Sequence, residues 1–271
     1  MRTTGVLAAA WAAWACGLAA CAADAALRAA AREVQARNQD AAVTVKLVTT
    51  RRWVMEGREG QKDESKSEVC GTVVDPSGLT VLSNFASDPT AQMAEMSFTS
   101  GGEKMDFKIQ TDVTDVKMIL ADGTEIPAQR VLTDKDLDLV FVRPAEKPGK
   151  PLPYVAFAKS AEPELLDDVI TLSRLGREVN RVTAIGLGTI CAIVKKPRTF
   201  YVSDLASGFT SMGCPVFNAK GQTLGLCVVR QDPVKGGGGR LFGAMQPVIL
   251  PAEDLLEVVK QALAAKAEEA K

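Results

Sequence analysis

Short runs of alternating apolar and polar residues, rich in β-branched side chains, cover most of the chain from Ala42 onward. This two-residue periodicity is typical of β-strands with one buried face. Asp122-Gly123 stands between two such runs and is a strong signal for a hairpin turn, and a further strand is predicted from Leu137. The later runs are DDVITLSRLG, REVNRVTAIGLGTICAIV, TFYVSD and PVFNAKGQTLGLCVV. The pattern therefore predicts an all-β fold.

Three interruptions divide this pattern into parts. The charged segment 51–67 contains Gly57 and Gly60 and predicts an exposed hairpin loop. Prolines at 144, 148, 151 and 153 indicate a boundary between two β subdomains, which we place at 41–145 and 146–250. An amphipathic pattern that starts at Pro251 predicts a C-terminal helix over 251–271, because proline suits the first turn of a helix.

The N-terminal part has a different texture. Residues 1–20 carry one charge, Arg2, followed by an alanine-rich apolar run, which predicts a secretory signal peptide. The run ends in Leu18-Ala19-Ala20-Cys21, which resembles the bacterial lipobox and predicts a lipid anchor on Cys21. Ordinary cleavage after Ala23 or Ala25 is the alternative. We therefore expect an exported protein of the bacterial periplasm or cell envelope, held at a membrane by lipid, with residues 21–40 as a helical tether.

Composition removes several classes of function. The net charge is −1 and no basic patch is interleaved with aromatic residues, so nucleic-acid binding is not expected. The chain contains no histidine. Cysteines at 70, 191, 214 and 227 permit up to two disulfides in an oxidising compartment, with a pairing that the sequence leaves open. No pair has C-x-x-C spacing, and we expect neither a metal site nor a cofactor.

Four stretches, in order, resemble the HtrA/Deg type of trypsin-like serine proteases. They are DPSGLTVLSNFAS (75–87), VKMILADGTEIPAQRVLTDKDLDLVFV (116–142), YVSDLASGFTSMGCPVFNAKGQTLGLCV (201–228) and LFGAMQPVILPAEDLLEVV (241–259). The resemblance runs from about residue 40 to the C-terminal helix. It implies two six-stranded antiparallel β-barrels followed by that helix, and we expect no PDZ domain.

The resemblance also implies where a catalytic triad would stand. Asp138 matches the catalytic aspartate, whereas the histidine position falls on Ala86 or, in a second alignment, on Phe85. The nucleophile position falls on Met212, and Thr210 replaces the glycine that helps to form the oxyanion hole. Such a triad requires an imidazole to take the serine proton and return it to the leaving group. We therefore predict a degenerate site in which Asp138 has a structural role.

Two neighbouring side chains are candidate substitutes for the nucleophile. Ser211 lies one position before Met212 and Cys214 lies two positions after it. A cysteine still needs a base or an electropositive site to form the thiolate, and without histidine only lysines such as Lys195 or Lys196 remain. We regard Cys214 as a buried small side chain or half of a disulfide.

Three functions follow in order of preference. The first is a catalytically inactive homologue, or pseudoprotease, that binds a peptide or protein partner, for example an active protease. The second is a serine-type endopeptidase that works unconventionally through Ser211 or Cys214. The third is a purely structural envelope lipoprotein.

Overall fold

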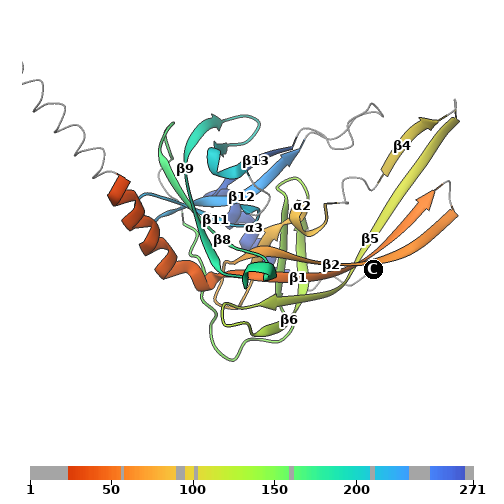
Figure 1. The fold of residues 1–271 in the computed structure, drawn as a ribbon, viewed down its shortest axis with the longest axis horizontal. Coiled ribbons are helices and arrows are strands. Elements are labelled where there is room, and N and C mark those ends of the chain that lie inside the picture. The colour runs from red at the N-terminus through yellow and green to blue at the C-terminus, as the bar shows by residue number, and fades with distance from the viewer. Residues whose placement is uncertain are drawn as a thin grey trace, which may run out of the picture.

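The computed structural model describes residues 24–55, 58–89, 95–100, 103–158, 162–207, 211–231 and 245–265. These residues form two closed six-stranded antiparallel β-barrels and a C-terminal helix, which confirms the predicted fold class (Figure 1). The predicted signal peptide and Cys21 lie outside the described residues. None of the described helices is long and apolar enough to cross a bilayer.

The first barrel closes because β1 pairs with β2 on one side and with β5 on the other. The hairpin predicted at Asp122-Gly123 is present, since Ile119 at the end of β5 pairs with Glu125 at the start of β6. The barrel strands follow the order β1-β2-β3-β7-β6-β5, and β4 (Glu95–Ser100) adds to β5 outside the barrel. Their bounds are β1 Ala42–Met55, β2 Arg58–Val73, β3 Thr80–Ser83, β5 Glu103–Ile119, β6 Glu125–Asp134 and β7 Leu139–Pro144.

The hairpin predicted over residues 51–67 is present, but the prediction that this segment is a loop was wrong. β1 and β2 stay paired as far as Met55 and Arg58, and β1 pairs with β5 over the same length. Together with β4 they form a sheet that projects from the first barrel (Figure 1). Charged residues are compatible with a strand here because backbone pairing, as between Arg52 and Gln110, holds the sheet, and an ion pair from Arg52 to Asp112 (3.2 Å) adds to it.

The second barrel follows the predicted linker and has the strand order β10-β13-β12-β11-β8-β9. Two short 3₁₀ turns, η3 (Arg177–Val179) and η4 (Asp204–Ser207), lie between its strands. The C-terminal helix α3 (Ala252–Ala264) starts directly after Pro251, which occupies the N-cap position without a side-chain hydrogen bond. Residues 266–271 of the predicted helix lie outside the described part. The strands are β8 Asp168–Arg174, β9 Thr183–Val194, β10 Phe200–Ser203, β11 Pro215–Asn218, β12 Thr223–Gln231 and β13 Met245–Pro251.

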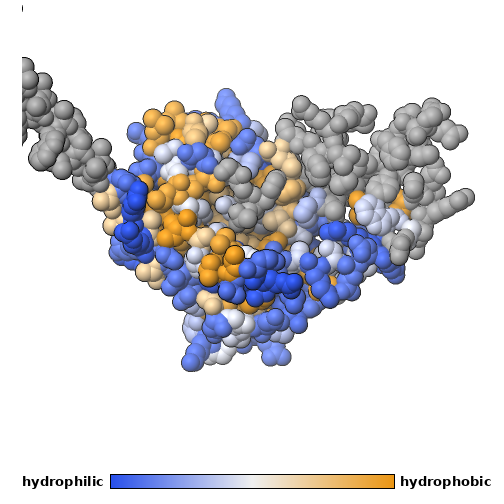
Figure 2. All heavy atoms as spheres, viewed as in Figure 1, coloured by the Kyte–Doolittle hydropathy of each residue, from blue (hydrophilic) through white to orange (hydrophobic). Residues whose placement is uncertain are grey.

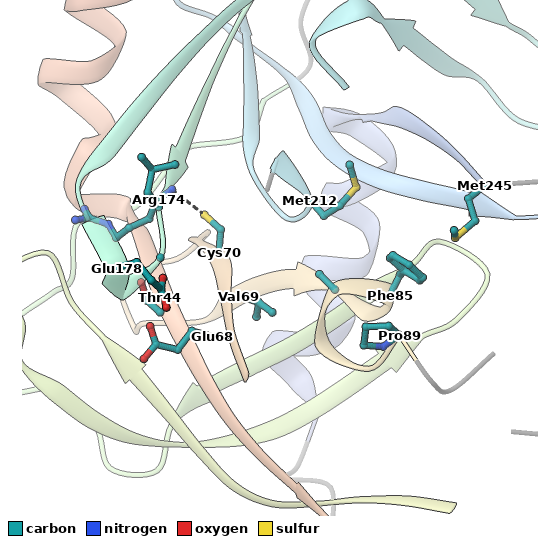
Figure 3. A pocket seen from close by; sticks show the side chains of 13 residues that line it. Thr44, Glu68, Val69, Cys70, Phe85, Pro89, Arg174, Glu178, Met212 and Met245 are labelled. Atoms are coloured by element: carbon teal, nitrogen blue, oxygen red, sulfur yellow. Dashed lines mark hydrogen bonds between the residues drawn. The ribbon is translucent and has the colours of Figure 1, made fainter. Parts of the chain in front are cut away.

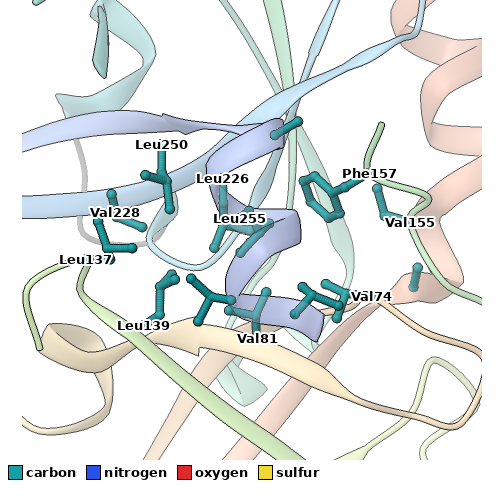
Figure 4. Packing of buried hydrophobic residues seen from close by; sticks show 14 of the residues in the cluster. Val74, Val81, Leu137, Leu139, Val155, Phe157, Leu226, Val228, Leu250 and Leu255 are labelled. Carbon is teal, nitrogen blue, oxygen red and sulfur yellow. The ribbon is translucent and has the colours of Figure 1, made fainter. Parts of the chain in front are cut away.

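The largest hydrophobic core lies between the two barrels (Figure 4). Val81 and Leu139 of the first barrel meet Leu226 and Leu250 of the second, and Leu255 of α3 packs into the same cluster. This shared core fixes the two barrels against each other, because its burial is lost if they separate. The arrangement sets the geometry of everything that lies at their junction.

A helix over residues 24–38 also contributes to this core, followed by the 3₁₀ turn η1 (Gln39–Ala41). Its side chains Ala31 and Val34 are 3% exposed and belong to the inter-barrel cluster. The other residues of this helix are mostly exposed. This part of the predicted tether is thus docked on the domain along one face.

Candidate functional site at the barrel junction

A cleft of about 840 Å³ opens where the two barrels meet. The first barrel contributes strands β1 and β2 and the short helix α2 (Asn84–Ser87), and the second contributes β8, the segment that follows it, and the start of β13. Most of the lining is apolar. Its residues are Thr44, Glu68, Val69, Cys70, Phe85, Ala86, Pro89, Arg174, Leu175, Gly176, Glu178, Met212 and Met245 (Figure 3).

Asp138 lies beside this cleft in the turn directly before β7, almost fully buried at 5% exposed. The tight turn between β6 and β7 places its backbone in the left-handed region, with a φ of 62°. Its carboxylate accepts three hydrogen bonds, from the hydroxyl of Ser83 (2.6 Å), the main-chain N–H of Phe85 (2.7 Å) and the main-chain N–H of Val229 (2.8 Å). Since Val229 belongs to the second barrel, this carboxylate links both barrels.

The protonation of Asp138 reflects two opposed effects. Burial raises the pKa of this carboxyl from 3.8 to about 6, while the hydrogen bonds from Ser83, Val229 and Phe85 act to lower it. Ser83 is also the N-cap of α2, because its hydroxyl oxygen accepts the N–H of Ala86 (3.1 Å). The carboxylate therefore holds the start of α2 in place through side-chain and backbone contacts.

The triad-equivalent positions predicted from the sequence are brought together here. Phe85, Met212 and Val229 form one buried apolar cluster, and Ala86 and Met245 pack against it. Met212 is 1% exposed, so its thioether fills the floor between α2 and the second barrel. Such a cluster offers no group that exchanges protons. Thr210 lies outside the described residues.

The candidate substitutes have different environments. Cys214 is completely buried, and its hydrogen bond to Cys70 together with burial raises the pKa of its thiol well above the ordinary value, which disfavours the nucleophilic thiolate. Ser211 lies in a 3₁₀ turn and is half-buried. Lys195 and Lys196 are exposed and follow the end of β9. None of the cysteines at 70, 191, 214 and 227 is in a disulfide in this structure.

Sequence reasoning missed the polar groups on the far side of the cleft. Arg174 on β8 donates from its guanidinium to the carbonyls of Gln39 (2.8 Å), Ala42 (2.6 Å) and Arg181 (3.0 Å). Arg181 in turn makes two hydrogen bonds to Glu68, at 2.6 and 3.0 Å, which lower the pKa of that carboxyl. These partners are up to 135 residues apart in sequence, and no local pattern marks them.

Comparisons with known proteins agree on the kind of fold. The sequence model of a family described as trypsin-like peptidase domain matches residues 70–226. Among solved structures, a variant of the HtrA-type protease AlgW, solved with a tripeptide, is similar with a TM-score of 0.53 and 18% sequence identity. The match covers 84% of this chain and 62% of that one, so the chain spans less than two thirds of its length. No curated protein matches this sequence.

Proposed function

The chain belongs to the family of trypsin-like peptidase domains, and from that membership we propose that it is a catalytically inactive, HtrA-like homologue that binds an extended peptide segment in its inter-barrel cleft. One observation carries the proposal: the cleft between the barrels is retained, but an apolar cluster occupies the positions of the catalytic histidine and serine. The segment belongs to a partner protein, for which an active protease is one candidate.

The case for inactivity rests on the groups that are missing. The chain has no histidine, and no other side chain has an ordinary pKa close enough to neutrality both to take the proton from the nucleophile and to return it to the leaving group. Loss of nucleophile or base lowers the rate of such enzymes by about 10⁴–10⁶-fold. With Met212 buried in the cleft floor and Ala86 beside it, residual hydrolysis is expected near background.

The case for binding rests on shape and on an available strand edge. The volume of about 840 Å³ is in the range of ligand sites and accommodates a short stretch of extended chain. Within the described residues, the ladder between β12 and β11 ends at Leu226, Cys227 still exchanges main-chain hydrogen bonds with Gly213 and Cys214, and the Val229 N–H donates to Asp138. The end of β12, at Arg230 and Gln231, pairs in the sheet with β13 alone. Such an edge is suited to a peptide that adds as a further strand. The family relative AlgW was itself solved with a tripeptide.

The lining indicates which peptides fit. On the face shown in Figure 2, hydrophobic side chains gather on the second barrel and toward the junction, whereas the first barrel presents mostly hydrophilic residues. Phe85, Met212 and Met245 line the cleft, so we expect it to hold an apolar peptide side chain. Methionines suit this task because the thioether adapts its shape to different partners.

Binding is tested by a screen of extended peptides followed by fluorescence anisotropy on the best of them. Ala86→Arg places a charge in the cleft and is expected to weaken binding by about tenfold or more, a loss of about 1.4 kcal/mol. The matched control is Leu187→Arg, at an exposed apolar position on β9 outside the cleft lining, which is expected to bind like the wild type. Failure of every peptide to bind would refute the binding role and favour the structural lipoprotein.

Inactivity has its own test. Bound peptide is expected to remain intact during long incubation, and a fluorophosphonate probe is expected to leave the folded protein unlabelled. Fluorophosphonate labelling that is lost in Ser211→Ala would establish an unconventional endopeptidase. So would peptide cleavage and alkylation that are both lost in Cys214→Ala.

We extend the proposal to location. Leu18-Ala19-Ala20-Cys21 supports export and lipid anchoring at the bacterial envelope, close to the start of the docked helix at residue 24. Incorporation of radiolabelled palmitate is expected in the wild-type protein and not in Cys21→Ala. Label that persists in the variant would remove the anchor from the proposal.

A further inference from the structure

Cys70 and Cys214 come from different barrels and meet under the cleft. Cys70 lies on β2 of the first barrel, and Cys214 directly precedes β11 of the second. Their thiols interact with each other, and the Cys214 thiol also donates to the main-chain carbonyl of Met212 at 3.9 Å. Neither cysteine is in a disulfide in this structure, and both residues are buried.

The backbones around the two cysteines are also in close contact. The hydroxyl of Thr72 on β2 donates to the carbonyl of Gly213 at 2.7 Å. A Cβ added at Gly213 would lie only 2.8 Å from the carbonyl oxygen of Cys70. A disulfide requires the Cα atoms of its two cysteines to lie about 4.4–6.8 Å apart, and these contacts bring the segments that carry Cys70 and Cys214 together.

Only one of the two thiols reaches the cleft. Cys70 lines the cleft and is 8% exposed, whereas Cys214 is 0% exposed and lies behind it. The main-chain N–H of Arg174 donates to the Cys70 sulfur at 3.4 Å, as the dashed line in Figure 3 shows. A small reagent that enters the cleft therefore meets the sulfur of Cys70 first.

From this arrangement we propose that Cys70 and Cys214 are a thiol-oxidation site, which a small disulfide entering the cleft converts into a disulfide bond that joins the two barrels. The proposal does not rest on the proposed peptide binding, although Cys70 lines the same cleft. Cys70 is the attacking thiol and Cys214 is the resolving thiol.

Electrostatics support this division of roles. The side-chain hydrogen bond with Cys214 lowers the pKa of Cys70, with smaller contributions from the N–H and charge of Arg174, although burial opposes them. The same hydrogen bond, together with burial, raises the pKa of Cys214. The thiolate, which is the reactive form, is thus favoured at the sulfur that the cleft exposes.

The reaction proceeds in two exchanges. The Cys70 thiolate attacks one sulfur of a small disulfide such as oxidised glutathione, whose S–S bond breaks and releases one glutathione thiolate. Cys214 then loses its proton to water and attacks the sulfur of Cys70. The Cys70–Cys214 bond forms, and the second glutathione thiolate leaves and takes up a proton. Two protein thiols are oxidised and one small disulfide is reduced to two thiols.

The experiment exposes the folded protein to a buffer of oxidised and reduced glutathione, followed by alkylation, intact mass measurement and peptide mapping. Cys191→Ser serves as the background, because Cys191 is exposed and would cross-link molecules. The expected product has lost the mass of two hydrogens and contains one cross-linked pair of peptides, around residues 70 and 214. Its thermal midpoint is expected to rise and to return after reduction with dithiothreitol.

Variants separate the two roles. Cys214→Ser is expected to accumulate a glutathione adduct on Cys70, and Cys70→Ser is expected to form neither adduct nor cross-link. Cys227→Ala is the matched control, since Cys227 is buried in the second barrel and is expected to leave the cross-link unchanged. If a serine variant fails to fold, the alanine variant at the same position replaces it. The cross-link expected in the protein with both cysteines tests the proposal even if neither variant folds. A Cys214–Cys227 bond, an adduct on Cys214, or both thiols remaining alkylatable after oxidation would overturn the proposal.

Discussion

Replacing Asp138 by asparagine tests which of two effects decides the pKa of this carboxyl. Burial disfavours the charged form, whereas the hydrogen bonds from its partners favour it. Asparagine has nearly the same shape and tolerates the left-handed backbone that Asp138 adopts, with its φ of 62°. The substitution removes the titrating proton and one acceptor, while the backbone stays as it is. Differences in the pH dependence of stability between the two proteins then report on this one group.

The magnitude follows from the pKa. Burial raises the pKa of Asp138 from 3.8 to about 6, so the folded state binds this proton more tightly than the unfolded state does. The resulting contribution is fully present below the unfolded pKa and is lost as the pH rises through the folded one. A shift of this size corresponds to about 3 kcal/mol, since each pKa unit is worth about 1.4 kcal/mol. The stability of the wild type relative to Asp138→Asn should fall by about that amount between roughly pH 3.5 and pH 6.5.

The assay is urea unfolding of both proteins over a series of pH values, with the difference in unfolding free energy plotted against pH. If the unfolding free energy of the wild type, relative to that of Asp138→Asn, rises with pH, the reasoning is refuted. Such a rise would mean that the three donors from Ser83, Phe85 and Val229 outweigh burial and hold the carboxylate below its ordinary pKa.

Three further predictions concern the packing around the cleft. Met212→Ala should lower the unfolding free energy by about 2–5 kcal/mol, measured by urea unfolding, because it leaves a cavity in a buried cluster; a loss under about 1 kcal/mol would mean that the floor is loosely packed. Gly213→Ala should destabilise more than Gly123→Ala in thermal melts. Both glycines have positive φ, but an added Cβ meets a backbone carbonyl of β2 at Gly213 and nothing within 4 Å at Gly123; equal losses would contradict this. Glu68→Gln should cost about 1 kcal/mol at neutral pH by breaking the paired hydrogen bonds to Arg181. Because the Arg181 contact lowers the pKa of Glu68 from its ordinary 4.5, this deficit should shrink as the pH falls below 4.5 and vanish once the pH passes the lowered pKa of the folded state. A deficit that persists in stronger acid would point to packing instead.

Local patterns in the chain were sufficient to predict the class of fold. Alternation of β-branched residues and the Asp122-Gly123 turn predict antiparallel strands because each depends on neighbours within a few residues. The same reasoning failed for residues 51–67, where β1 lies between β2 and β5. Strand pairing on both sides is a long-range property, and it overrides the low strand preference of charged side chains.

The positions around Asp138, Ala86 and Met212 were predicted from the sequence, but their environment was not. Nothing local shows that Met212 is buried against Phe85 and Val229, or that Ser83 both caps α2 and donates to Asp138. Burial is set by the residues that surround a side chain in space. Those residues come from four separate segments of the chain, at residues 83–86, 138, 212 and 229.

By itself the sequence determined two things about this protein: an all-β architecture, and the absence of any imidazole for acid–base chemistry. Both depend on residue identity and short-range order. The tertiary structure alone decided that the helix over residues 24–38 docks on the core, that a cleft persists beside the apolar cluster, and that Cys70 meets Cys214. These features arise where the two barrels touch, because the shared core brings together residues that the chain keeps far apart.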